Sequence, residues 1–525
     1  MIASFARRCV LAAVAAVFAL NGAGCFPSRE SAYSDVRGSR LHSYALWRGE
    51  AELANALPRA AGNLSIEDSV RLALAYSPTL QSIVQEQEKA RGQVWTALSD
   101  ALPMVDFAAD YTRLDQVSTV NFGGSSVQVG SRDNWSYQVN VTQPLFRGSL
   151  SYALTGARLF QCLTDEKVRQ AVQDVVFQVA VAYYDAVLAQ HLYQVQVEAL
   201  QFAEANLRDV SVRQEAGVAI PFDVLRARVE VSNVQADMIQ QRNTMNRART
   251  ALFKGMGVSQ KSDVTLTGEL AYNPTTPDLE EAVRTAYMNR PELYQGEFDL
   301  RFQRAALQVL RSKYLPELEA WGTQLWAEPN PHDSSDLGWG RRWTAGLRLR
   351  WTLFDGLLRE GNIIQQKAVL RQSQIRLADT EQAVVQQVAN AMLDLADADE
   401  LVRSQQLNLE RANEALRLVT IGAQEGVNTE LEVLDARSAL TRARGLYYTA
   451  LHSHVVACLT LQQAIGMMAP PTGQGTVPKE GPRTGVIEQF LSKAVPGEAL
   501  PEQAPTQSGE GGAAGSQPRP TEATD

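Results

Sequence analysis

Most of this 525-residue chain consists of two diverged copies of one unit. Short segments recur in the same order, 208 to 213 residues further along the chain. The matched segments are Ser77–Leu80 and Arg290–Leu293, Ala101–Pro103 and Tyr314–Pro316, Gln143–Gly148 and Trp351–Gly356, Glu215–Val218 and Gln424–Val427, Asp223–Arg228 and Glu432–Arg437, and Met256–Gly257 and Ile465–Gly466. Because solenoid repeats have periods of roughly 20–50 residues, this pattern indicates a duplicated, domain-sized unit.

Each copy reads as a helix, two strands, a long helix, a turn and a returning helix. We assign residues 63–270 to the first repeat and 271–468 to the second. The expected helices are 66–101, 149–216, 221–255, 278–315, 357–425 and 428–465, and the expected strands are 103–114, 135–146, 316–327 and 342–354. A loop is expected between the two strands of the first repeat. Gly217 ends its long helix, and Pro221 suits the first position of the helix that returns.

The helix expected over 149–216 is unusually long, because helices above about 25 residues are typically coiled coils or membrane spans. Apolar residues recur at steps of three and four between 176 and 207, and the matching positions from 385 to 416 repeat the pattern. This spacing predicts coiled-coil packing. The leading and returning helices together match the long helix in length, so we expect them to stack end to end beside it.

The strands alternate apolar and polar residues. Within 342–354, Trp343 and Trp351 fall on an apolar face, while Arg348 and Arg350 fall on the other face. A half-buried soluble sheet has the same period. However, the two tryptophans bracket the apolar face like the aromatic girdle of a membrane barrel, and the strand lengths suit tilted membrane strands. We therefore expect four transmembrane strands in each chain.

Four strands cannot close a barrel, and open sheet edges are not tolerated in lipid. Two chains would give eight strands, whose side chains fill the interior, whereas three would give twelve and leave a pore. Arg348 and Arg350 would then face water in the lumen, which favours a trimer. The expected fold class is mainly α with a β-barrel segment. Duplicated long helical hairpins join four strands per chain, which close as a 12-stranded barrel in a trimer.

The N-terminus has the features of a secretory signal. Two arginines precede an apolar run over 10–20, and small residues follow. This run is too short to span a bilayer as a helix, so residues 1–24 are expected to be a cleaved signal peptide. Cys25 follows Ala-Gly as in a bacterial lipobox, in which the cysteine is acylated and heads the mature chain. Gly22 stands where that pattern prefers Leu, so ordinary cleavage near Ala23 is the alternative.

The remaining segments flank the two repeats. Residues 25–62 are expected to be an extended, lipid-anchored lead to the first helix. Residues 469–525 are rich in Pro, Gly, Ser and Gln, a composition that cannot bury a core, so this tail is expected to be largely disordered.

Composition argues against nucleic acid as a partner and against catalysis. The net charge of −9 opposes phosphate binding. The chain has only 5 His and 4 Cys, with no CxxC pair, and it lacks the common nucleotide-binding, serine-nucleophile and zinc motifs. His452 and His454 are two residues apart on a helix, whereas paired metal ligands usually sit four apart. We expect no enzyme, no metal and no cofactor.

The ordered, duplicated set of segments resembles the TolC-like outer-membrane efflux protein family. It is most similar to the lipoprotein branch that serves tripartite efflux systems of the RND type. The resemblance covers residues 60–468 and implies a homotrimer in the outer membrane of a bacterium, with a helical tunnel extending into the periplasm. It places Gly217 and Gly426 at the periplasmic tip. An adaptor (membrane fusion) protein would dock there, and an inner-membrane pump would supply energy while small molecules pass without chemistry.

The resemblance also implies acidic residues at the periplasmic aperture. Glu432 and Asp435 match the family's constriction positions, although Thr429 and Glu432 also fit a helix capping box. Capping explains Asp435 less well, because it lies beyond the first turn. Asp223 matches a position that holds the tip closed through a tyrosine. Ala423 stands at that partner position here, so closure must be held otherwise.

Two other functions fit part of the pattern. A periplasmic coiled-coil scaffold explains the long helices but not the alternating strands between them. The outer-membrane component of type I protein secretion, served by an ABC pump, would have the same architecture. The sequence does not name the exported compound.

Overall fold

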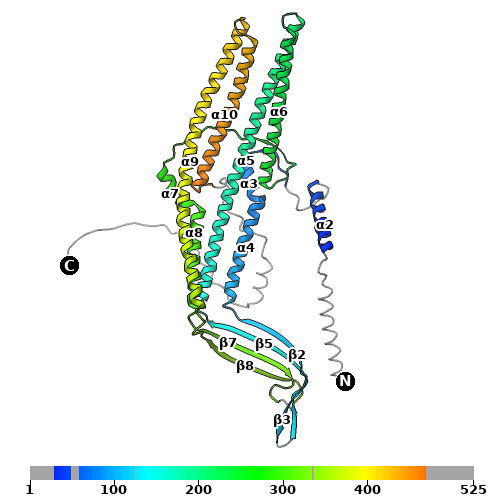
Figure 1. Ribbon diagram of the computed structural model, residues 1–525, viewed down its shortest axis with the longest axis vertical. Coiled ribbons are helices and arrows are strands. Elements are labelled where there is room, and N and C mark those ends of the chain that lie inside the picture. Colours follow the sequence, from blue (N-terminus) through cyan, green and yellow to red (C-terminus); the bar gives the residue numbers. More distant parts are fainter. Residues whose placement is uncertain (1–28, 49–57, 123–124, 334–335, 469–525) are drawn as a thin grey trace, which may run out of the picture. The chain divides into compact units, whose positions relative to one another are not determined.

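The computed structural model describes residues 29–48, 58–122, 125–333 and 336–468 (Figure 1). The predicted signal peptide, Cys25 and the tail over 469–525 lie outside the described residues. The elements are α2 (Arg29–Arg48), β1 (Ala61–Leu64), α3 (Ile66–Tyr76), α4 (Pro78–Ser99), β2 (Met104–Arg113), β3 (Ser118–Phe122), β4 (Ser125–Val129), β5 (Asp133–Phe146), α5 (Leu150–Glu215), α6 (Pro221–Met256), β6 (Asp263–Leu266), α7 (Leu279–Asn289), α8 (Pro291–Ser312), β7 (Glu317–Glu328), β8 (Gly340–Arg350), α9 (Leu358–Gln424) and α10 (Glu430–Ala464).

Two long helices organise the fold. α5 has 66 residues and α9 has 67, so each is about 100 Å long at ~1.5 Å per residue. α4 and α6 pack along α5, and α8 and α10 pack along α9. The shorter helices therefore stack end to end beside each long one, as the matching lengths predicted (Figure 1). α5 also packs against α8 and α10, which joins the two repeats.

α5 is the one helix among the described residues that is long and apolar enough to cross a membrane on length and composition alone. Its buried residues Val175, Val176 and Val179 belong to a core cluster shared with α3, α6 and the β1–β6 pair. Packing within the chain therefore accounts for much of its apolar character, since a buried core helix meets the same criterion.

Each leading helix is broken, which corrects the single helices expected over 66–101 and 278–315. Ser77 and Arg290 leave the helical region, with ψ of 121° and 118°, and a proline follows each. Proline has no N–H and disfavours a helical residue before it. Gly257 and Gly466, with φ of 71° and 73°, lie against these two breaks.

Gly257 provides a prediction about stability. A Cβ at this position would lie 2.7 Å from the carbonyl carbon of Tyr76, and the left-handed backbone disfavours any side chain. Gly257→Ala should lower the free energy of unfolding by about 1–2 kcal/mol from the backbone alone, and by more from the collision. Gly92→Ala is the control, because Gly92 lies in α4 with nothing within 4 Å. That change should stabilise the helix slightly. Chemical denaturation would measure both, and equal effects would contradict the argument.

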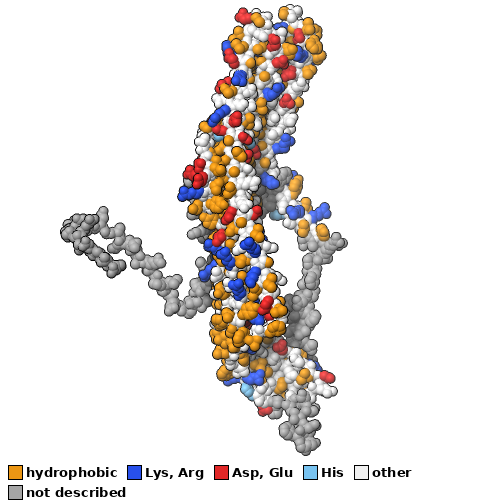
Figure 2. Space-filling model, turned by 60° about the vertical axis from the view of Figure 1, so that its left-hand side comes forward, with side chains coloured by type: hydrophobic (Ala, Val, Ile, Leu, Met, Phe, Trp, Pro, Cys, Tyr) orange, Lys and Arg blue, Asp and Glu red, His pale blue; other side chains and the backbone are white. Residues whose placement is uncertain are grey.

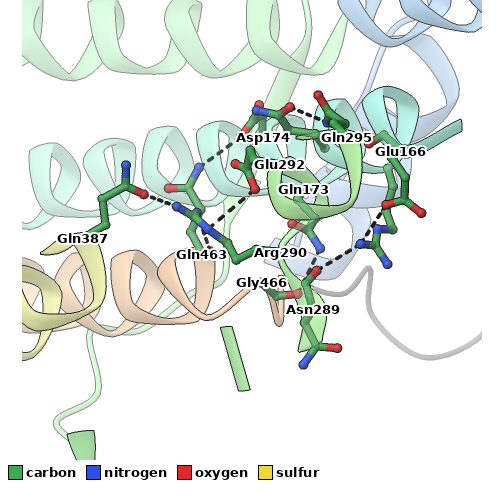
Figure 3. Close-up of polar contacts among 12 residues, drawn as sticks. Glu166, Gln173, Asp174, Asn289, Arg290, Glu292, Gln295, Gln387, Gln463 and Gly466 are labelled. Carbon is green, nitrogen blue, oxygen red and sulfur yellow. Dashed lines mark hydrogen bonds and ion pairs between the residues drawn. The ribbon is translucent and has the colours of Figure 1, made fainter. Parts of the chain in front are cut away.

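A buried arginine ties the two repeats together at the second break (Figure 3). Arg290 is 7% exposed. Its guanidinium donates to the Gln463 carbonyl of α10 at 3.3 Å and to the Gln387 side chain of α9. Gln463 in turn donates to Asp174 of α5 at 3.1 Å, which carries the network into the first repeat. The matching residue of the first repeat is Ser77, so duplication did not preserve this link.

Strands from both repeats form one antiparallel sheet in the order β2-β5-β7-β8. The central pair, β5 with β7, joins the first repeat to the second. β2 and β8 are the edges. The sheet lies at the opposite end of the long helices from the turns between α5 and α6 and between α9 and α10 (Figure 1).

Three expectations about strands and loops were wrong. The strand expected over 342–354 is Gly340–Arg350, because Arg350 pairs with Glu317 and the next partner would be Pro316, which has no N–H for the ladder. Trp351 therefore follows the strand. The loop expected after 114 contains the β3–β4 hairpin, whose short strands carried no clear alternation. The extended lead expected over 25–62 contains helix α2 and the first two residues of strand β1, which pairs in parallel with β6.

Candidate functional site: a two-faced sheet and paired helical turns

The strand register gives the sheet one polar and one apolar face. Residues directly opposite each other on paired strands share a face. On one face lie Asp106, Asp110, Ser136, Gln138, Asn140, Thr142, Glu317, Glu319, Trp321, Thr323, Arg342, Thr344, Arg348 and Arg350. The other face is mainly apolar and carries Val105, Phe107, Ala109, Tyr111, Trp135, Tyr137, Val139, Val141, Leu318, Ala320, Trp326, Trp343, Ala345, Leu347 and Leu349, together with the polar residues Arg113, Asp133, Gln143, Gln324, Glu328 and Arg341. A sheet with these two faces fits between lipid and water.

Aromatic side chains gather toward the two ends of the apolar face. Trp343 lies on β8 and is 74% exposed, and near it on other strands are Trp135, Tyr137 and Trp326. The Tyr137 ring stacks on Trp339 with centroids 5.4 Å apart. Trp351 lies beyond the other end of β8, where its indole N–H donates to the Tyr314 carbonyl at 3.0 Å. The two tryptophans predicted as a girdle thus sit at opposite ends of the apolar face.

Arg348 and Arg350 lie on the polar face, as the alternation predicted. The Arg348 guanidinium donates to Glu319 at 2.8 Å and lies over the Trp321 ring, 5.5 Å from its centroid. Arg350 stands opposite Glu317 in the register. The sequence analysis did not single out Glu319 or Trp321, because only pairing with β8 shows which face each residue occupies.

A hydrogen-bond network around Arg359 stabilises the corner between the sheet and α9. Arg359, 7% exposed, donates to Asp355 at 2.8 Å and to the carbonyls of Lys313 and Leu353 at 3.2 and 3.1 Å. Its guanidinium also lies over the Tyr314 ring, 4.5 Å from the centroid. Near this corner, hydrophobic side chains gather on the surface where the helices meet the sheet (Figure 2). The corner therefore fixes the direction in which the sheet leaves the helices.

The two turns at the far end of the helices have the same construction. Gly217 and Gly426 have φ of 77° and 75°, which suits glycine at a helix C-terminus. The side chains of Val218 and Val427, which follow them, are 80% exposed. The structure thus places both predicted tip turns at the same end of the helices (Figure 1).

Two of the three acidic aperture candidates cap helices. Asp223 accepts from the Ile220 N–H at 3.3 Å. Glu432 accepts from the Asn428 side chain at 3.0 Å and from the Thr429 N–H at 2.8 Å. The Asn428 hydrogen bond, and then the Thr429 one, hold the pKa of Glu432 below its usual range. Capping therefore accounts for Glu432. Asp435 is exposed, and its carboxylate makes no hydrogen bond or ion pair within the described part of the chain.

Near the turns, α5 and α10 are linked by residues that the sequence analysis missed. Arg213 pairs with Asp209 at 2.7 Å and with Glu430 at 3.5 Å. The Arg437 guanidinium lies over the Phe202 ring at 4.0 Å, and burial lowers its pKa. Phe202, Asp209, Glu430 and Arg437 line a groove of about 680 Å³ between α5, α6 and α10. The heptad spacing in the sequence indicates that these helices pack together. It does not indicate which helix Arg213 or Arg437 contacts.

Comparison with known proteins identifies the family. The model of the outer membrane efflux protein family matches residues 70–258 and 282–467. The chain belongs to the outer membrane efflux protein family. The two matched segments fall in the two repeats, so each repeat of this efflux protein carries its own copy of the family unit.

Individual relatives cover most of this efflux protein. Protein CyaE of Bordetella pertussis is 26% identical over 80% of this chain and 87% of its own length. Outer membrane protein TolC of Vibrio cholerae is 23% identical over 75% and 88%. The crystal structure of the Campylobacter jejuni CmeC outer membrane channel superposes with a TM-score of 0.66, at 15% identity, over 78% of this chain and 87% of that one. The likeness to CmeC shows a shared fold.

His452 and His454 of α10 lie near acidic residues on different helices. His452 lies 2.8 Å from Asp185 of α5, and the buried His454 lies 3.3 Å from Asp399 of α9. They point to different neighbours, as residues two apart on a helix should. The described residues contain no group of three or more His, Cys, Asp or Glu that could hold a metal ion. The family is one of efflux channels rather than enzymes.

Proposed function

We propose that this outer membrane efflux protein is the exit duct of a tripartite system and works as a homotrimer. The supporting observation is a four-stranded sheet with an apolar face, a polar face and two edges, β2 and β8, that have no partner within the described chain. In lipid every backbone polar group needs a partner. Three chains would pair each β8 with the β2 of the next chain and close a barrel of twelve strands.

In that barrel the polar face lines the lumen. Arg348 and Arg350 face water, and the aromatic residues around Trp343 and Trp351 lie at the two membrane interfaces. Twelve strands leave an aqueous passage, whereas eight would be filled by side chains. The two repeats, over 63–270 and 271–468, then contribute equivalent hairpins to a helical tunnel.

The paired turns at Gly217 and Gly426 are the proposed periplasmic tip. Their exposed valines offer an apolar surface on which a periplasmic adaptor protein docks, and an inner-membrane pump of the RND type drives the cargo. Asp435 is the best candidate for lining the aperture, because its carboxylate is free, whereas Asp223 and Glu432 serve as helix caps. With Ala423 at the tyrosine position, we propose that Arg213 and Glu430 help to hold the tip closed.

The proposed localisation is the outer membrane, with an acyl anchor on Cys25 after removal of residues 1–24. Cys25→Ser should abolish labelling of the protein by radioactive palmitate while leaving the oligomer in the membrane fraction. Persistent labelling of that variant would contradict the anchor.

The trimer itself has a direct test. Protein extracted from the outer-membrane fraction in detergent should migrate as a heat-modifiable species of three chains, and deletion of the gene should raise sensitivity to small toxic compounds. A soluble periplasmic monomer would contradict the channel and favour a coiled-coil scaffold. Unchanged drug sensitivity together with loss of a secreted protein would instead assign the channel to type I secretion.

A further inference from the structure

One side chain on the polar face of the sheet breaks the pattern of that face. Among the described positions of β2, β5, β7 and β8, Trp321 is the only aromatic residue that the register places with the polar residues. Its neighbours on that face are Thr142, directly opposite on β5, and Glu319, Thr323 and Arg348, all of which are charged or polar. In the proposed channel this face is the lumen wall, so the inference rests on the proposed function.

The surroundings hold the Trp321 ring in place. Gly346 stands directly opposite it on β8, and a Cβ there would lie 3.3 Å from three atoms of the indole. The indole ring therefore packs against the backbone of Gly346. Arg348 covers it with a guanidinium 5.5 Å from the ring centroid, and Glu319 fixes that guanidinium at 2.8 Å. Cation–π contact and the ion pair together limit the movement of the ring.

Shielding of a strand glycine by an aromatic neighbour is a known structural device, but the first repeat builds the matching hairpin with neither the glycine nor the aromatic residue. The register of the first repeat pairs Ala108 with Gln138 where the second pairs Trp321 with Gly346. It likewise pairs Asp106 with Asn140 where the second pairs Glu319 with Arg348. The same hairpin thus forms without an aromatic residue, a glycine or a cation at these positions.

The three residues found only in the second repeat, Trp321, Gly346 and Arg348, can together bind an aromatic ligand. A partly exposed indole beside a guanidinium offers stacking and cation–π contact to a flat π-system, and such contact depends little on the ligand's other groups. We propose that Trp321, with Arg348 and Gly346, is a contact site in the channel wall for planar aromatic molecules that pass through. A trimer presents three such sites at one level of the barrel.

The test measures block of the channel by two probes of equal charge. Purified trimers are placed in planar lipid bilayers, and naphthalene-2-sulfonate is compared with its saturated analogue, decahydronaphthalene-2-sulfonate. The decisive variant carries Trp321→Ala and Gly346→Gln, which installs the pair that the first repeat already uses. Half-block of this variant by the aromatic probe should require about tenfold more probe than half-block of the wild type. The saturated probe should not distinguish the two proteins.

Three further variants keep the test decisive if the double variant fails to assemble. Trp321→Leu covers Gly346 without an aromatic ring and should lose the preference for the aromatic probe, whereas Trp321→Phe should retain most of it. Trp343→Leu, on the opposite face, should behave as wild type. If the wild type conducts but none of the variants at 321 changes the aromatic preference, the contact site is wrong. If the wild type forms no conducting pore, the proposed channel function and the proposed contact site are both wrong.

Discussion

Replacing Arg359 with alanine should lower the free energy of unfolding by about 1–3 kcal/mol, because it leaves the half-buried carboxylate of Asp355 and two backbone carbonyls without their guanidinium donor. Asp355 loses its 2.8 Å bond, and the carbonyls of Lys313 and Leu353 lose their donors at the corner between β8 and α9. Arg359→Lys should recover part of the loss. A lysine ammonium keeps the positive charge, but it lacks the planar, forked guanidinium that donates to Asp355 and to both carbonyls at once. Unfolding of the detergent-solubilised protein in guanidinium would measure these differences.

Arg371 provides the control for this prediction. It lies on the same helix and is exposed, and among the described residues its side chain donates only to Gln374, at 3.1 Å. Arg371→Ala should change the unfolding free energy by no more than about 0.5 kcal/mol. If Arg359→Ala proved as mild as the control, the corner would not depend on the buried pair, and the path of the chain from sheet to helix would need another cause.

A charge on the apolar face of the sheet should be far more damaging than the same charge on the polar face. Leu347 lies on the apolar face of β8 and is 68% exposed in the single chain. Leu347→Arg should destabilise a lipid-facing strand by about 2–4 kcal/mol per chain, which in a trimer becomes about 6–12 kcal/mol. The yield of heat-modifiable oligomer in the outer-membrane fraction is the measurement.

Thr344 is the matched position for that experiment. It lies three residues earlier on β8 and on the opposite face, among the polar residues proposed to line the lumen. Thr344→Arg should assemble nearly as well as the wild type and change ion selectivity instead. Equal loss of oligomer from both variants would show that the two faces of the sheet do not meet lipid and water.

Part of the candidate site could be read from the order of residues. The alternation in β8 placed Arg348 and Arg350 on the face opposite Trp343, and the register confirms this arrangement. The same pattern overestimated the strand, because alternation continues through Leu353 while the partner strand begins after Pro316. A one-strand pattern carries no information about where its neighbour starts.

The acidic residues at the turns show a different limit. Spacing allowed Glu432 either to cap a helix or to line an aperture. The 2.8 Å bond from the Thr429 N–H shows the cap, and the aperture role of Glu432 stays a prediction. Asp435 makes no such contact in the described structure and keeps its proposed role. The bridge from Arg213 to Glu430 could not be foreseen, because it joins residues more than 200 positions apart.

The sequence by itself determined the duplication, the long helices and the two-faced strands, because these follow from local periodicity and from comparison of the chain with itself. Tertiary structure alone decided that β5 pairs with β7 across the repeats, that Arg290 and Arg359 are buried, and that Trp321 faces the polar side against Gly346. Strand pairing and burial depend on contacts between distant segments. A shift of one residue in register would move every side chain of a strand to the other face.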